Sequence, residues 1–382
     1  AVNQSNPIKI CFKGFIEAWE QRKLGDAINI GSGRDYKHLG EGNIPVYGTG
    51  GYLTSVDQAL SSEKDAVGIG RKGTINSPYI LKAPFWTVDT LFFCLPKPGV
   101  DLNFLFCLFQ RVDWKKKDES TGVPSLSKRT IENTEIPFCS IEEQRKIGTF
   151  FDSLEKTITL HQSKLSKFQM LEATLLLKMF PKHGGTKPEI RFASFNNEWR
   201  LHKFEDLFSE YAIKGFDQYS ALSVVQGAGT IERDRSNRNL SYSTKNLGNY
   251  KVVYKDDFIL HLRSFEGGLE RANSTGLVSP AYHVFHSRKV NSSFIYRIFR
   301  SSNFINRLLS PCVYGIRDGK SVDVSELKKV LLTVPDISEQ RKLGYLFDLI
   351  DKVISLHQRK ADLLKQIKSS LLQSMFPPSN AE

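Results

Sequence analysis

Apolar residues recur at alternating spacings of three and four in two long stretches, residues 142–181 and 338–377. The stretches match at a constant offset of 196, with about half of their positions identical. Between the opening turn and a closing Phe-Pro pair neither contains glycine or proline, so each stretch predicts one long helix. The apolar seam consists of Ile147, Phe151, Leu154, Ile158, His161, Leu165 and Phe168 in the first helix, and of Leu343, Phe347, Ile350, Ile354, His357 and Leu364 in the second.

A narrow apolar seam of this kind has to be buried against another helix. Two such helices in one chain most simply pack on each other, and the length of the chain between them allows either orientation. Antiparallel packing would relate the two halves of the chain by an approximate two-fold axis. Polar residues interrupt both seams at matching places, first at His161 and His357 and then at Glu172 and Lys368.

The repeat extends beyond the helices, because residues 10–27 resemble residues 190–207, with Trp19 matching Trp199. The chain therefore reads as two tandem repeats, each a globular domain followed by a helix. The predicted segments are a first domain at 1–140, a first helix at 141–182, a second domain at 183–337 and a second helix at 338–382. Short β-rich runs bounded by Gly, Pro, Asn and Asp, together with helical patterns at 102–114 and 292–309, predict α+β domains with a twisted sheet and long loops.

Composition narrows the choice of partner and compartment. The 382 residues carry a formal net charge of +12, which favours a polyanionic partner such as nucleic acid. The five cysteines are scattered without a CxxC pair, so we expect neither a disulfide framework nor a metal site, and a reducing cytoplasm suits them. No signal-peptide core or apolar run of membrane-spanning length stands out, so no membrane partner is expected.

Two glycine-rich motifs look like nucleotide sites but lack what such sites need. Gly68–Gly73 fits GxGxxG, yet the following Thr-Ile-Asn-Ser-Pro cannot start the helix that binds a pyrophosphate. Gly315–Ser321 is one residue short of a P-loop. Both motifs instead predict tight basic turns, the first exposing Arg71 and Lys72, with Ser120–Ser125 as the first repeat's counterpart of the second turn. No carboxylate–histidine–nucleophile pattern is visible, so no catalytic residue is assigned.

Basic and polar residues of the loops are therefore the candidate DNA contacts, since Arg and Lys neutralise phosphate and Arg can read guanine. The candidates are Arg34, Lys37, Tyr47, Arg71, Lys72 and Ser125 in the first domain, and Arg233, Arg235, Arg238, Arg263, Arg271, Arg317 and Lys320 in the second.

The tandem plan resembles one known family. A Glu-Gln-Arg-Lys motif opens each helix at Glu143–Lys146 and Glu339–Lys342, preceded by Pro137 or Pro335, and Leu-His-Gln-x-Lys lies at mid-helix. These features resemble the specificity subunit of type I restriction-modification enzymes, and the resemblance covers essentially the whole chain.

The resemblance implies two target recognition domains separated by an antiparallel coiled coil, each domain reading one half of a split, asymmetric DNA sequence. It implies a non-catalytic subunit that binds double-stranded DNA and two methyltransferase (modification) subunits, with motor/nuclease (restriction) subunits in the full complex. S-adenosylmethionine, ATP and Mg²⁺ are expected on those partners, and no cofactor on this chain.

Two other classes stay open on the residues alone. One is a coiled-coil adaptor that joins two protein-binding domains, its basic charge being incidental. The other is a self-contained DNA nuclease or methyltransferase, which would require activity from the purified chain. A salt titration of duplex binding separates DNA recognition from the adaptor, because only phosphate contacts are lost steeply with salt.

Overall fold

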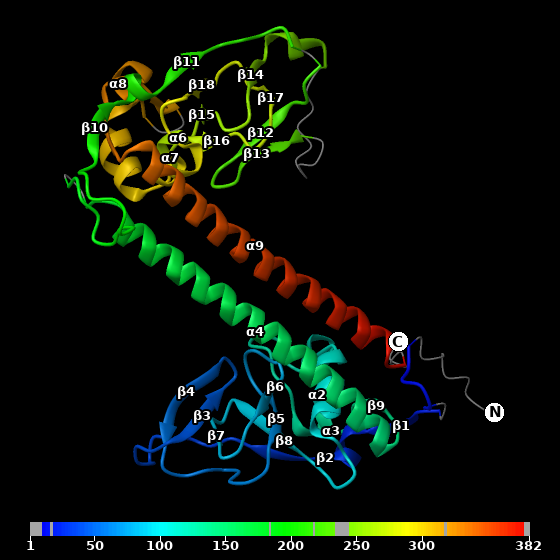
Figure 1. Ribbon diagram of the computed structural model, residues 1–382. Coiled ribbons are helices and arrows are strands. Elements are labelled where there is room, and N and C mark those ends of the chain that lie inside the picture. The colour runs from blue at the N-terminus through cyan, green and yellow to red at the C-terminus, as the bar shows by residue number, and fades with distance from the viewer. Residues whose placement is uncertain are drawn as a thin grey trace. The chain divides into compact units, whose positions relative to one another are not determined.

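The computed structural model describes residues 10–15, 18–182, 185–216, 218–233, 244–316 and 319–377. The chain divides into two compact units, one formed by residues 1–163 with 358–382 and the other by residues 164–357. Helix α4 (Ile141–Met179) begins in the first unit and ends in the second, whereas α9 (Ile337–Ser374) begins in the second and ends in the first. Each unit therefore pairs the start of one long helix with the end of the other, which makes the pairing antiparallel (Figure 1).

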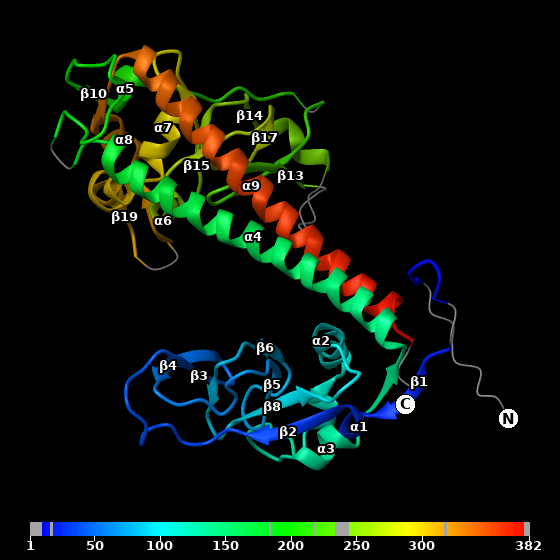
Figure 2. The same ribbon diagram turned by 60° about the horizontal axis from the view of Figure 1, so that its bottom comes forward.

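The first unit is built on a four-stranded sheet in the order β2-β8-β5-β6, with a smaller mixed sheet, β4-β3-β7, in which β3 and β7 run parallel. Strand β1 pairs with β9. The elements of the first unit before α4 are β1 Glu20–Lys23, α1 Leu24–Ala27, β2 Ile28–Ser32, β3 Ile44–Gly48, β4 Gly51–Val56, β5 Ala66–Gly70, β6 Tyr79–Leu81, β7 Trp86–Thr87, β8 Leu91–Pro96, α2 Leu102–Arg111, the 3₁₀-helix η1 Trp114–Lys117, α3 Lys128–Glu132 and β9 Glu135–Phe138. Figure 2 labels all four strands of the four-stranded sheet.

The second unit repeats this plan, with a four-stranded sheet in the order β11-β18-β15-β16 (Figure 1) and with strand β10 paired with β21. Its elements before α9 are β10 Arg200–Lys203, α5 Phe204–Leu207, β11 Ser209–Tyr211, β12 Leu222–Val225, β13 Gly229–Glu232, η3 Thr244–Asn249, β14 Lys251–Val253, β15 Phe258–Leu260, α6 Ser264–Gly267, β16 Glu270–Arg271, β17 Gly276–Val278, β18 His283–His286, α7 Ser292–Phe299, the π-helix η4 Phe304–Leu309, η5 Ser310–Cys312, β19 Val313–Tyr314, β20 Ser321–Val322, α8 Val324–Lys329 and β21 Leu331–Val334. The predicted α+β class and internal repeat are confirmed.

The helical pattern at 292–309 does not form one helix. Helix α7 ends at Phe299 and the chain resumes as η4 at Phe304. Ser301 explains the break, since its hydroxyl donates to the Ile298 carbonyl at 2.7 Å and accepts from the Phe304 amide at 3.1 Å. One serine thus satisfies backbone groups at both helix ends, which competes with continuing the helix.

The paired helices complete the core of each unit. In the first unit the Phe151 ring lies 6.2 Å from the Phe376 ring, which stacks on Phe104 of α2. In the second, Phe180 lies 5.8 Å from Phe347 and stacks on Phe294 of α7. All thirteen seam residues named above are buried or half-buried. The closing Phe-Pro of each helix therefore belongs to the core of the other repeat's domain.

The Glu-Gln-Arg-Lys-x-Gly motif holds each helix start against its own domain. Gln144 accepts from the Asp101 amide at 3.1 Å, and Gln340 accepts from the Asn291 amide at 2.9 Å. Asp101 and Asn291 are the N-caps of α2 and α7. A side chain at Gly344 would put a Cβ 2.3 Å from the Asn291 carboxamide oxygen, so glycine is needed for this close approach.

The described part of the chain contains no helix with the length and apolar character of a membrane span. Over the same residues, no three His, Cys, Asp or Glu side chains gather as ligands for a metal ion would. All five cysteines are free.

Candidate nucleic-acid interface

The turn that follows β5 exposes two of the predicted cations. Arg71 and Lys72 are exposed, and no helix follows them, as the sequence predicts. Gly73 adopts a φ of +94°, and a Cβ on Gly70 would lie 2.1 Å from the Thr74 carbonyl oxygen. Glycine at these positions therefore lets the chain reverse tightly and project the basic residues.

A second loop pairs with this turn. The Gly73 amide donates to the Pro124 carbonyl at 2.8 Å and the Leu126 amide to the Arg71 carbonyl at 2.9 Å, so Ser125 lies beside Lys72. Asp118 accepts from the amides of Ser120 and Ser125, and these bonds lower the pKa of its carboxyl group. The Asp118 carboxylate thus holds the loop in place beside the turn.

The two loops surround an open cavity of about 540 Å³. Among its lining residues are three predicted candidates, Arg71, Lys72 and Ser125. Lys128 lines it too and was missed by the sequence reasoning, although it belongs to an exposed basic pair that opens α3. Its ammonium group donates to the Ile30 carbonyl at 3.0 Å. This cavity is the strongest cluster of candidates in the first unit.

The remaining candidates of the first unit are Arg34, Lys37 and Tyr47, and they differ in exposure. The amide of Arg34 donates to the Thr87 carbonyl and the amide of Arg71 to the Thr90 carbonyl, both at 2.8 Å, so the two backbones meet the same turn before β8. Arg34 and Lys37 are exposed. Tyr47 is half-buried, with its ring 6.1 Å from that of Tyr79, so part of its surface serves the core.

In the second unit Arg263 comes three residues after β15, at the N-cap of α6, whereas Arg71 directly follows β5. Arg263 is exposed. Lys320, also exposed, precedes β20, and its ammonium group lies 5.9 Å from the ring of Phe265 in α6. The hairpin β19–β20 is the basic glycine turn predicted from the sequence, with Gly315 at a φ of +86°. Arg317 lies outside the described residues.

Two other candidates of the second unit are engaged within the protein. Arg271 donates to the Ser293 hydroxyl at 2.7 Å and lies over the Tyr296 ring at 5.5 Å. Arg233 donates to the Tyr250 hydroxyl at 3.2 Å and stacks on the same ring. Both are half-buried, which leaves them less free to reach a ligand than Arg263. Arg235 and Arg238 lie outside the described residues.

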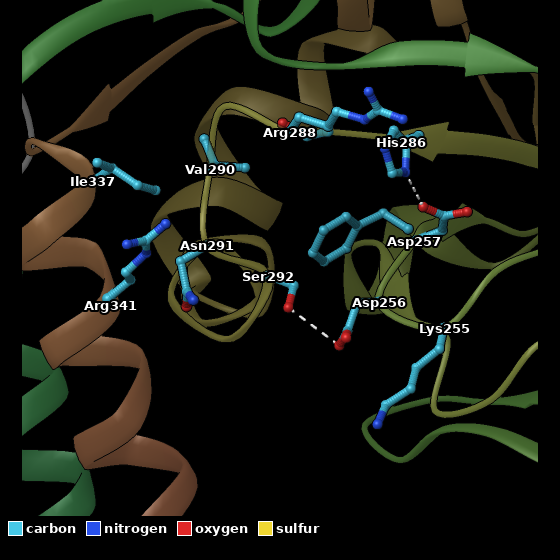
Figure 3. A pocket seen from close by; sticks show the side chains of 12 residues that line it. Lys255, Asp256, Asp257, His286, Arg288, Val290, Asn291, Ser292, Ile337 and Arg341 are labelled. Atoms are coloured by element: carbon cyan, nitrogen blue, oxygen red, sulfur yellow. Dashed lines mark hydrogen bonds and ion pairs between the residues drawn. The ribbon is translucent and has the colours of Figure 1, made fainter.

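A further pocket of about 260 Å³ brings together basic residues that the sequence reasoning did not single out (Figure 3). Lys255, Arg288 and Arg341 line it, all exposed. In Figure 3, Arg341 projects from α9 beside Asn291 on one side of the pocket, and Lys255 lies on the opposite side. Of the three cations, only Arg341 belongs to a sequence motif. Because the three lie far apart in the chain, their proximity could not be predicted from the sequence.

Acidic side chains of this pocket are already satisfied by protein groups. Asp257, which is 2% exposed, accepts from the Tyr211 hydroxyl and pairs with His286 Nδ1 at 2.7 Å. Burial and the hydrogen bond to Asp257 raise the pKa of the Tyr211 phenol. The Asp256 carboxylate accepts from Ser292 at 3.2 Å. The outward-facing charge of the pocket is therefore mainly basic.

Comparison with known proteins shows which proteins this chain is similar to. Residues 16–170 match the model of the type I restriction modification DNA specificity domain. A specificity subunit of Methanocaldococcus jannaschii, of the type I restriction enzyme MjaVIII, is 22% identical over 285 residues, covering 69% of this chain and 66% of that protein. Its MjaIX counterpart is 25% identical over 334 residues, covering 78% and 73%.

A putative type I specificity subunit of Mycoplasma genitalium, S.MgeORF438P, is 26% identical over 166 residues, which cover 41% of this chain and 43% of that protein. The chain thus matches less than two thirds of the length of two of these curated relatives. Among solved structures, the S subunit of a type I restriction-modification system from M. genitalium aligns with a TM-score of 0.66 at 13% identity, over 97% of this chain and 99% of that one.

The resemblance noted in the helix motifs is confirmed by these matches: in sequence the chain is similar to type I specificity subunits, and it has the fold of one. These curated relatives are named as specificity subunits of type I restriction enzymes.

Proposed function

We propose that this chain, as a type I restriction-modification specificity subunit, binds double-stranded DNA and reads a split, asymmetric sequence with one half per globular domain. In this proposal residues 1–140 and 183–337 are the two target recognition domains, and residues 141–182 and 338–382 are the spacer helices. The chain itself holds no cofactor; S-adenosylmethionine, ATP and Mg²⁺ would act on partner subunits in the cytoplasm.

One observation carries the proposal: both units expose an arginine within three residues of the end of the matching strand, the third in the order of each four-stranded sheet. Arg71 follows β5 and Arg263 follows β15, and each has a further exposed cation close by, Lys72 or Lys320. Exposed arginines on fixed turns suit base-edge and phosphate contacts, because the turn presents the guanidinium without ordering a loop. The net charge of +12 adds the sequence-independent phosphate term.

Sequence differences between the two turns support unlike half-sites. The first unit offers Arg-Lys beside Ser125, whereas the second offers Arg263 beside a hairpin that carries Lys320. Each domain therefore presents its own set of donors, and specificity would come from the sum of both sets. Helices that run from one unit into the other are the elements that would set the number of base pairs between the halves.

The same helices offer a surface for the methyltransferase subunits. On α9 within the second unit, Tyr345, Leu349 and Leu356 are 72%, 47% and 49% exposed and follow one another at spacings of four and seven. That spacing places them on one helix face, away from the buried seam. We propose that this face, and its counterpart around Leu160 of α4, receive helices of the modification subunits.

The test is selection of duplexes from a randomised DNA pool, followed by binding titrations at several salt concentrations. We expect two short sequence blocks separated by a constant spacer, and a steep loss of affinity with salt. If the selected duplexes share a single contiguous sequence block, the proposal of a split DNA target is refuted. An absence of salt-dependent duplex binding would overturn DNA recognition and favour the coiled-coil adaptor.

Arginine variants then locate the contacts. Arg71→Ala and Arg263→Ala should each weaken binding to the selected duplex by about 1–3 kcal/mol and relax specificity in one block only. The matched controls are Arg22→Ala and Arg200→Ala, which remove an exposed arginine from β1 and β10. Equal losses in controls and test variants would show that only net charge matters.

A further inference from the structure

The hairpin of β3 and β4 contains a β-bulge that its counterpart in the second unit lacks. Val46 pairs with Thr54 and Tyr47 with Tyr52, so Leu53 is an extra residue on β4. Hairpin β12–β13 keeps a regular register, from Leu222 opposite Glu232 onward. Bulges occur beside functional sites because they re-aim side chains that a regular strand would turn away.

In this hairpin the bulge leaves two consecutive apolar side chains in solvent. Tyr52 is 62% exposed and Leu53 is 52% exposed. A regular half-buried strand would alternate and direct one of two neighbours inward. The regular hairpin of the second unit exposes Val225 and Ile231 by only 36% and 37%. The exposed pair is thus a feature of the first unit's hairpin.

The pair stands on a rigid support. Tyr79 donates its hydroxyl to the Gly48 carbonyl at 2.6 Å and packs against Tyr47, whose ring in turn lies 6.4 Å from the ring of Tyr52. The Tyr52 hydroxyl is 3.1 Å from the Ser55 hydroxyl. These contacts hold the Tyr52 side chain in place, so little conformational entropy is lost when it meets a ligand.

The hairpin tip lies beside the basic turn. A Cβ on Gly73 would be 3.9 Å from the Thr49 hydroxyl oxygen, which places the tip next to the turn that carries Arg71 and Lys72. An apolar pair next to cations is complementary to one class of ligand in particular, a polyanion with stacked apolar faces. Nucleic acid has this chemistry, whereas a purely apolar protein surface would leave the cations desolvated without partners.

We propose that Tyr52 and Leu53 form a wedge that presses against a base step of the DNA half-site read by the first unit and partly unstacks it. The inference rests on the DNA recognition proposed above. Apolar side chains inserted at base steps kink a duplex, and the energy needed to unstack the step differs with sequence, so the wedge adds specificity without a hydrogen bond to a base. The second unit, whose hairpin has no bulge, should leave its half-site stacked.

The test places 2-aminopurine, whose fluorescence rises when it is unstacked, at single adenine positions of the selected duplex. With the full-length chain at saturating concentration, we expect a fluorescence rise at one or two neighbouring positions in the first unit's block and none in the other block. Tyr52→Ala and Leu53→Ala should reduce the rise and weaken binding between about fivefold and 150-fold, the range of one aromatic–base stack. Tyr52→Phe, which keeps the ring, should retain both.

Arg71→Ala separates this inference from the proposed function. At saturating protein it should bind more weakly yet still raise the fluorescence, because the wedge is intact. If the wild-type chain binds the duplex without any fluorescence rise, or if Tyr52→Ala and Leu53→Ala both retain the full rise, the wedge is refuted while DNA recognition stands. Unchanged DNA binding by these two variants together with lost binding of a modification subunit would likewise refute it and assign the pair to a protein contact. If the wild-type chain binds no duplex at all, the proposed function is refuted instead.

Discussion

At one pair of matching positions along the paired helices, the two units balance the charges of the side chains in different ways. In the first unit, Lys368 Nζ lies 2.5 Å from Glu155 Oε2. The matching positions of the second unit hold two acids, Glu172 and Asp351, and burial together with the charge of Asp351 raises the pKa of Glu172. Arg297 of α7 supplies the missing positive charge, contacting Glu172 at 3.3 Å and Asp351 as well. Its own counterpart in the first unit is the neutral Cys107.

Replacing this arginine should destabilise the second unit measurably. Arg297 and Glu172 are only 11% and 21% exposed, so Arg297→Cys leaves buried acids without a cation. Removing one partner of a fully buried pair costs about 3–5 kcal/mol, and exposed pairs contribute little. Because Asp351 is 48% exposed, we expect a loss of about 2–3 kcal/mol at pH 7.5.

The loss of stability in Arg297→Cys should depend on pH, and the direction of this dependence follows from the pKa of Glu172. Burial, followed by the charge of Asp351, raises the pKa of Glu172 above its model-peptide value of 4.5, while Arg297 opposes the rise. An acid whose folded pKa is raised stabilises the protein below its unfolded pKa, and that contribution is lost as the pH rises through the folded pKa. Without Arg297 the folded pKa should rise further. The cost of Arg297→Cys should therefore be largest at pH 7.5 and shrink towards pH 5.

The assay is hydrogen exchange of the full-length chain, followed by mass spectrometry of peptides from α7 and from the first half of α9. Adding Glu172→Lys to Arg297→Cys reproduces the charges at the matching positions of the first unit and should restore most of the protection. Arg307→Met, which removes an exposed arginine from η4, is the matched control. Unchanged protection in Arg297→Cys, an equal loss at pH 5 and pH 7.5, or no rescue by the second substitution would refute the reasoning.

Two further changes to the chain test whether the two domains recognise DNA independently and whether Gly344 is needed in the helix motif. Exchanging residues 1–140 for the corresponding domain of a relative should change one block of the selected DNA sequence and leave the other unchanged; altered preference in both blocks, measured by the same selection, would contradict independent domains. Gly344→Ala should destabilise the second unit by about 1–2 kcal/mol in urea unfolding, because the new methyl group collides with the Asn291 cap and loss of a cap outweighs the gain in helix propensity. Tyr345→Ala, on the exposed face next to it, serves as control, and a Gly344→Ala chain as stable as the wild type would show that the cap can move aside.

The long helices could be predicted from sequence because their signal is local. A seam of three-four spacing, a repeat at constant offset and the absence of glycine and proline all act over neighbouring residues, and the observed α4 and α9 follow them closely. The tight turns could be predicted for the same reason, since Gly70 and Gly73 are needed by the backbone itself. The break in the helical pattern after Phe299 was missed, because Ser301 is an ordinary polar residue until its hydroxyl finds both backbone groups.

Sequence by itself thus determined the repeat, the helices and the presence of basic turns. Tertiary structure decided how exposed each cation is and what stands beside it: Arg271 is half-buried against Ser293, whereas the exposed Arg71 is brought to Ser125 and Lys128 by two loops about fifty residues apart. It also decided that Phe180 and Phe376 close the cores of the opposite repeats' domains. The physical reason is that exposure and pairing depend on which distant segments pack together, and spacing along the chain carries no record of that choice.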